Sequence, residues 1–104
     1  MRRLLPLLAG ACTILTPEAF APERRAAVCA VEAACFGTHA SEQDCLDALG
    51  EPDEPACEDF DLGAANDCVR VLRHHAWACP TTDRALWQVP ATCAEACALT
   101  PVSE

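Results

Sequence analysis

The sequence contains no tyrosine and no lysine, and only one methionine, two tryptophans and three phenylalanines. All seven basic residues are arginines, and sixteen acidic residues outweigh them, which gives a formal net charge of −9. A chain this negative repels the phosphate backbone of nucleic acids and the headgroups of anionic lipids. We therefore expect no nucleic-acid partner and no membrane binding through a basic surface.

Catalytic motifs are also missing from the sequence. There is no Cys-x-x-Cys redox pair and no glycine-rich phosphate-binding loop, and only two serines occur. One of them, Ser41, is explained by helix capping, and cysteines paired in disulfides cannot act as nucleophiles. We predict that the protein is not an enzyme and that it binds no cofactor.

Cysteine, in contrast, is abundant, with nine residues in a chain of 104. The hydrophobic core of so short a chain is only marginally stabilising, and small exported proteins compensate with disulfides. With Cys12 set aside, an even set of eight remains, spread along the chain, so that all of them can pair. The cysteines that we predict to form four disulfides are Cys29, Cys35, Cys45, Cys57, Cys68, Cys79, Cys93 and Cys97.

The N-terminal segment has the features of an export signal. Two arginines follow Met1, and residues 4–15 form an uncharged, largely apolar run that is too short to span a bilayer as a helix. Three interpretations remain open: two routes of signal processing, and an N-terminal segment that stays as a buried helix of the folded protein. We expect an exported protein, either secreted or an outer-membrane lipoprotein.

The two processing routes predict different mature chains. Residues 8–12, Leu-Ala-Gly-Ala-Cys, resemble a bacterial lipobox, although Ala9 replaces the usual leucine, and this route would lipidate Cys12. The other route cleaves after Ala21, which satisfies the small-x-small rule, and leaves a leader of residues 1–21 and a single Cys-rich helical domain of residues 22–104. A possible lipid on Cys12 is the one membrane attachment that we expect.

The rest of the sequence predicts short helices joined by turns. Residues 26–36 form the first predicted helix, with Pro22 at an initial helical position and Gly37 as its terminator. Ser41 has an acidic residue three positions on, as in a capping box, and the short second helix ends at Gly50.

The third predicted helix is the longest, capped by Asp61 and stopped by Pro80. A turn of helix is expected around residues 83–88, and Thr92 with Glu95 predicts a capping box for a last helix that carries two cysteines. An apolar stripe at helical spacing defines the buried face of the third helix: Ala65, Cys68, Leu72, Ala76 and Cys79. The predicted fold class is all-α, with three to four short helices cross-linked by about four disulfides.

Two groups of residues contain potential metal ligands, but neither has the spacing that a metal site requires. His75 and Cys79 lie one helical turn apart, but further ligands are missing and an exported cysteine is expected in a disulfide. Residues 42–61 hold nine carboxylates, but they lack the ligand positions of an EF-hand loop. We predict no metal site.

Helix geometry excludes some cysteine pairs. Cys29 and Cys35 lie about 9 Å apart along one helix, beyond the reach of a disulfide. Cys93 and Cys97 share a helical face, which favours two bonds to neighbouring elements. The pair that we favour is Cys35 with Cys45, because an antiparallel helical hairpin would bring them together.

The order of elements between residues 28 and 97 carries a resemblance. A Cys-x5-Cys helix is followed by a helix with one cysteine, then by CEDFDLGAANDC at residues 57–68 and PATCAEAC at residues 90–97. This order resembles a loose group of small Cys-rich exported proteins, often lipoproteins, of predatory soil bacteria. The resemblance implies a fold and a compartment, but no activity, ligand or catalytic residue.

Three function classes fit these observations. The one that we favour is an envelope or secreted interaction module for an unknown protein partner, and the oligomeric state stays open. The alternatives are a secreted effector or toxin-like protein, and a small hydrolase inhibitor with a constrained loop at residues 80–90 or 51–55. Trp77 and Trp87 could anchor a partner, but we expect both to fill the core, because tryptophan is usually largely buried.

Overall fold

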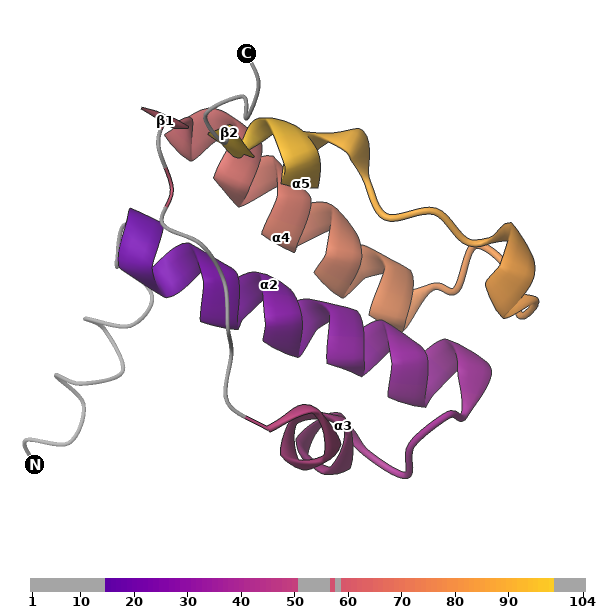
Figure 1. Ribbon diagram of the computed structural model, residues 1–104. Helices are drawn as coiled ribbons and strands as arrows, with labels where there is room; N and C mark the ends of the chain where they lie inside the picture. Colours follow the sequence, from indigo (N-terminus) through magenta and orange to yellow (C-terminus); the bar gives the residue numbers. More distant parts are fainter. Residues whose placement is uncertain (1–14, 51–56, 58, 99–104) are drawn as a thin grey trace, which may run out of the picture.

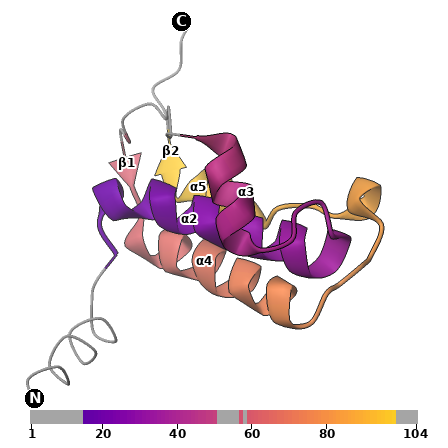
Figure 2. The same ribbon diagram turned by 90° about the horizontal axis from the view of Figure 1, so that it is seen from below.

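The computed structural model describes residues 15–50, 57 and 59–98 (Figure 1). Two long helices lie side by side, and shorter elements lie along the outer side of each (Figures 1 and 2). No helix within these ranges is long and apolar enough to cross a membrane. The elements in chain order are α2 (Pro17–Val31), the π-helix η1 (Glu32–Phe36), α3 (Glu42–Leu49), β1 (Asp59–Phe60), α4 (Leu62–Trp77), the 3-10 helix η2 (Arg84–Leu86), α5 (Ala91–Glu95) and β2 (Cys97–Ala98).

Helix α2 begins at Pro17, upstream of the predicted start. The hydroxyl of Thr16 accepts a hydrogen bond from the Ala19 amide at 3.1 Å, and Pro17 occupies the first helical position. The expectation that Pro22 starts the helix is therefore wrong, because Pro22 lies inside α2. A Thr-Pro pair supplies both a cap and a pre-set backbone angle, which makes residues 16 and 17 the stronger start signal.

Three other local signals are confirmed. Gly37 ends the first helical segment with a φ of 64°, in the left-handed region that favours glycine. Ser41 caps α3 by accepting from the Asp44 amide at 3.0 Å, and α3 ends at Gly50. Asp61 caps α4 through a 3.0 Å hydrogen bond from the Ala64 amide.

The core lies between α2 and α4. The first four residues of the predicted stripe lie on α4 and face the core, with Ala65, Cys68 and Leu72 fully buried. The predicted extension of this helix to Pro80 is wrong, because α4 ends at Trp77 and Cys79 lies exposed beyond it. Helix α2 contributes Phe20, Ala27 and Val31. The π-helix continues the same face and buries Cys35 together with a carboxylate, Glu32.

The C-terminal helix is shorter than predicted. Helix α5 ends at Glu95, and Cys97 pairs as a strand residue with Phe60, antiparallel, so the predicted helix through Cys97 is wrong. The predicted capping box is also wrong: α5 has Pro90 as its N-cap, and the Thr92 hydroxyl is buried without a hydrogen-bond partner among the described residues. Pairing with β1 and a disulfide to Cys57 override the local helical signal.

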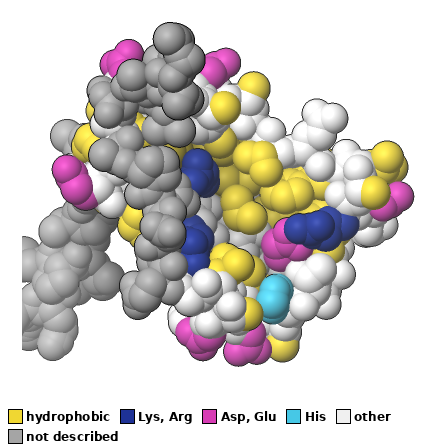
Figure 3. All heavy atoms as spheres, viewed as in Figure 1, with side chains coloured by type: hydrophobic (Ala, Val, Ile, Leu, Met, Phe, Trp, Pro, Cys, Tyr) yellow, Lys and Arg dark blue, Asp and Glu magenta, His cyan; other side chains and the backbone are white. Residues whose placement is uncertain are grey.

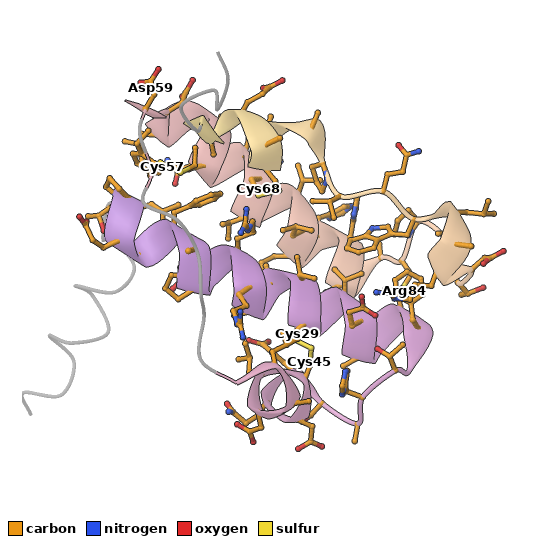
Figure 4. All side chains as sticks on the ribbon, in the orientation of Figure 1. Cys29, Cys45, Cys57, Asp59, Cys68 and Arg84 are labelled. Atoms are coloured by element: carbon orange, nitrogen blue, oxygen red, sulfur yellow. A yellow bond between two sulfur atoms is a disulfide. The ribbon has the colours of Figure 1, made fainter. Side chains whose placement is uncertain are left out.

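All eight predicted cysteines are paired. The bonds are Cys29–Cys45, Cys35–Cys79, Cys57–Cys97 and Cys68–Cys93. A small, mostly helical domain with four disulfides is confirmed as the fold class, and each bond joins different elements. Figure 4 shows the bond between α2 and α3.

The predicted pair Cys35–Cys45 is wrong. Cys45 bonds to Cys29, and Cys35 bonds to Cys79, beyond the end of α4. The six residues from Cys29 to Cys35 cross from α2 into the π-helix, and they do not complete a whole number of turns, so the two side chains leave the axis in different directions. Cys29 and Cys35 therefore face different neighbours, and the hairpin brings Cys45 to the first of them.

Candidate functional site

The segment from Ala78 to Pro90, here called the strap, runs from the end of α4 back to α5 along the outside of the helix pair (Figure 1). At its start, Cys79 bonds to Cys35, with 5.6 Å between the Cα atoms. Just past its end, Cys93 bonds to Cys68, with 4.7 Å between the Cα atoms. The strap is thus covalently attached to the helices at both ends. Ten of its thirteen residues lie outside regular secondary structure, and the other three form η2.

An ion pair fixes the middle of the strap. The Arg84 guanidinium donates from Nε to Glu32 Oε1 at 2.8 Å and from Nη2 to Oε2 at 2.7 Å. The Thr38 hydroxyl donates to the same carboxylate at 3.0 Å. Because Glu32 is only 8% exposed, its charge needs these partners, and the Arg84 guanidinium lowers the pKa of Glu32 below its ordinary value. Figure 4 labels Arg84 where it reaches back toward the helices.

Trp87 attaches the strap to the core. Its indole N–H donates to His75 Nδ1 at 3.1 Å, and its ring packs against Phe36 with 5.7 Å between the ring centroids. Trp87 is half-buried against the core cluster, as expected for a core residue. The hydrogen bond requires an unprotonated Nδ1, since a protonated nitrogen has no lone pair to accept.

Trp77 behaves differently. It is 86% exposed, so the expectation that it fills the core is wrong. It follows Ala76, the last helical residue of the buried stripe, and one position turns a side chain by about 100° away from that face. Two further large apolar side chains, Leu86 at 70% and Val89 at 46%, are exposed on the strap.

These three side chains, here called the distal residues, belong to the end of α4 and to the strap. Figures 1 and 2 both show the end of α4 and η2 at the opposite end of the molecule from the start of α2. On the face seen in Figure 3, hydrophobic side chains also gather between the strap and the helix pair. Exposed aromatic and aliphatic side chains on a braced backbone are typical of a protein-binding surface.

The residues considered for a metal do not come together. Cys79 is in a disulfide, His75 accepts from Trp87, and His74 lies exposed on α4. No group of three or more potential ligands forms within the described part of the chain. Of the acidic run, Glu42 pairs with Arg73 at 2.9 Å, while residues 51–56 and 58 lie outside the described residues, as does Cys12.

The inhibitor loop that we considered at residues 80–90 is this strap. An inhibitor that blocks a hydrolase in the manner of a substrate presents an extended backbone, whereas Arg84–Leu86 forms a helical turn. The Arg84 side chain is also engaged by Glu32. The other candidate loop, residues 51–55, lies outside the described residues.

Sequence analysis missed the pair between Glu32 and Arg84. One signal was available: Glu32 follows Val28 by four positions and precedes Cys35 by three, so a carboxylate lies on the apolar face of the first helix. A charge at such a position requires a buried partner. The identity of that partner could not be read from the sequence, because it lies 52 residues away.

No protein-family model, no curated protein and no solved structure matches this chain. The resemblance to small Cys-rich exported proteins therefore stays a prediction, and the fold, the disulfides and the exposed surface carry the functional inference.

Proposed function

We propose that this chain is an exported protein-interaction module that binds a protein of the cell envelope or of the cell's surroundings through its distal residues. Four disulfides fit an oxidising compartment, because reducing cytosol keeps such thiols free. The observation that carries the proposal is the exposure of Trp77, at 86%. Tryptophan is among the residues that contribute most binding energy when a partner covers them.

Rigidity supports the same function. The backbone near the distal residues is held by a disulfide at Cys79 and by the ion pair at Arg84. A surface that is already ordered loses little conformational entropy when it binds. The negative charge of the chain favours a neutral or basic partner over an acidic one.

Site-specific photocrosslinking tests this proposal. A photoreactive amino acid at Leu86, in cells that produce the full chain, should give one discrete adduct with a protein, and Trp77→Ala should reduce its yield at least tenfold. The same probe at Asn66, on the exposed face of α4, is the matched control and should give no such adduct. Equal adducts at both positions, or a Leu86 adduct that ignores Trp77→Ala, would contradict the proposed binding end. Toxicity of the added protein toward other cells, without any adduct, would favour the effector class.

A further inference from the structure

One attachment of the strap depends on a titratable side chain. The indole N–H of Trp87 donates to His75 Nδ1 at 3.1 Å, and the two rings meet edge to face, with 6.4 Å between their centroids. Both residues are half-buried, and Trp87 also packs against Phe36. The indole N–H is therefore directed at a nitrogen that must keep its lone pair free.

Protonation of His75 removes that lone pair. A neutral imidazole has one N–H and one acceptor nitrogen, whereas the protonated ring carries an N–H on both nitrogens. Rotation of the protonated ring therefore cannot restore an acceptor for the indole. Two N–H groups would face each other at a half-buried position, where a polar group without a partner destabilises the packed arrangement. Histidine side chains in general change charge between roughly pH 5 and pH 8.

The charged groups around His75 follow from the elements packed against it. The Cys35 sulfur lies 3.1 Å from the His75 carbonyl oxygen, so the π-helix lies beside this residue, and Trp87 brings the strap to its ring. The last charged residue of α2, Arg25, lies ten positions before Cys35, or about 15 Å along the helix. The charged and titratable side chains of the π-helix, the turn after it, the last five residues of α4 and the strap are Glu32, His39, Arg73, His74, Asp83 and Arg84.

These groups supply no counter-ion for a protonated His75. Glu32 is bound by the Arg84 guanidinium at 2.7 Å, and the Asp83 carboxylate accepts from the Ala85 amide at 3.0 Å. No ion pair within the described ranges involves His75. A proton on His75 would therefore have no anionic partner in the closed arrangement. The other three groups are cationic when charged: His39, Arg73 and His74.

We propose that His75 and Trp87 form a pH-sensitive latch, in which protonation of His75 releases Trp87 and opens the strap between its two disulfides. Opening is local, because Cys79 and Cys93 stay bonded to the helices on either side. The rings of Trp87 and Phe36, which cover each other in the closed strap, become exposed to solvent.

The ion pair at Arg84 limits how far the strap opens. A hydrogen bond from Arg84 lowers the pKa of Glu32 below its ordinary value of 4.5, so the carboxylate stays charged while histidine takes up a proton. The strap therefore remains attached at Arg84 in mild acid, and the moving part is confined to residues 85–90. Both attachments are lost on acidification, the one at His75 before the one at Glu32.

The latch regulates the proposed binding end. Leu86 and Val89 lie on either side of Trp87 in the sequence and are exposed on the part of the strap that opens. Once the strap opens, they lose their fixed position relative to Trp77, and binding must then supply the lost conformational entropy. Binding should therefore weaken in mild acid. This consequence rests on the proposed function, whereas the opening of the strap does not.

Fluorescence quenching of Trp87 tests the latch. Trp77→Phe leaves Trp87 as the single tryptophan, and the fold should not change, because Trp77 is 86% exposed. In this parent protein the bimolecular quenching constant for acrylamide, which is corrected for the excited-state lifetime, should at least double between about pH 7.5 and about pH 5. The far-UV circular dichroism should stay unchanged over the same range.

Two histidine variants of the parent protein provide the comparison. His75→Asn keeps a neutral acceptor oxygen near the position of Nδ1 and cannot titrate, so its quenching constant should stay low at both pH values. His74→Asn changes the neighbouring exposed histidine and is the matched control, which should titrate like the parent.

A quenching constant that does not change with pH in the parent protein overturns the proposal, as does an equal rise in His75→Asn. Loss of helical signal together with the rise shows global unfolding and also overturns it. Should His75→Asn not fold, the NMR titration of the His75 ring in the parent protein decides, and a midpoint that differs from the quenching midpoint contradicts the latch. The measurement uses purified protein without a partner, so its failure and failure of the crosslinking at Leu86 are distinguishable.

Discussion

Glu32 and Arg84 lie 52 residues apart in the sequence and form a bidentate ion pair between the π-helix and the strap. The carboxylate is buried, whereas the arginine side chain is 63% exposed. The pair joins a helix terminus to a segment with little regular structure, so its loss should affect the strap before it affects the helices.

Glu32→Gln should lower the free energy of unfolding by about 1–2 kcal/mol at neutral pH, because hydrogen bonds to a charged group are lost while a polar side chain remains. Thermal unfolding followed by circular dichroism measures the change. Arg84→Gln should also destabilise the protein, since it leaves a buried carboxylate with one hydroxyl partner. A variant as stable as the wild type would contradict a structural role for the pair.

The same pair should make the stability of the protein depend on pH in the acidic range. The pKa of Glu32 is lowered in the folded protein from its ordinary value of 4.5. Its contribution is therefore fully present above pH 4.5 and is lost as the pH falls through the lower, folded-state pKa. Melting temperatures between pH 2 and 6 should fall more steeply for the wild type than for Glu32→Gln. Parallel curves would show that the carboxylate does not contribute.

The two tryptophans should respond differently to truncation. Trp77→Ala should change stability by less than about 0.5 kcal/mol, because the side chain is almost fully exposed. Trp87→Ala should cost about 2–3 kcal/mol, below the range of fully buried tryptophans, since it removes a half-buried ring and the hydrogen bond to His75. Chemical denaturation of the two variants side by side is the measurement. Equal destabilisation would mean that Trp77 is packed in solution.

Reduction should unfold the protein. In the chain-entropy model a disulfide that closes a 16-residue loop contributes about 3 kcal/mol and one that closes 44 residues about 4 kcal/mol, which for Cys29–Cys45 and Cys35–Cys79 together is comparable to the net stability of a small domain. Circular dichroism with and without reductant should show loss of helicity. Peptide mapping of the unreduced protein should return the four observed pairs, and helicity that survives full reduction would contradict the scaffold role.

Two glycines offer a matched test of backbone conformation. Gly37→Ala should destabilise the protein by about 1 kcal/mol, because the residue has a φ of 64° although no atom lies within 4 Å of the added Cβ. Gly63→Ala, in the first turn of α4, should instead stabilise it by about 0.5–1 kcal/mol, since its Cβ would meet Asp61 Oδ1 at an ordinary 3.4 Å. Opposite signs in thermal unfolding are the expected result, and the same sign for both would contradict the helix ends described here.

Local chemistry accounts for what could be predicted of the fold. The caps at Ser41 and Asp61 and the terminator at Gly37 act on backbone groups within five residues, so a short stretch of sequence is enough to predict their effect. The start at Pro17 was missed although it has the same kind of local signal, because Pro22 also suits a helix start. The disulfide-rich class followed from the number of cysteines.

The sequence by itself determined that the eight cysteines can pair completely, that helices end at Gly37 and Gly50, and which face of α4 is apolar. Tertiary structure alone decided that Cys35 bonds to Cys79, that Arg84 neutralises Glu32 and that Trp77 is exposed while Trp87 is covered. Each of these depends on the rotation of α2 against α4 and on the course of the strap. A helical pattern gives a side chain's direction around its own axis, but the neighbour that it meets is set by packing across the whole chain.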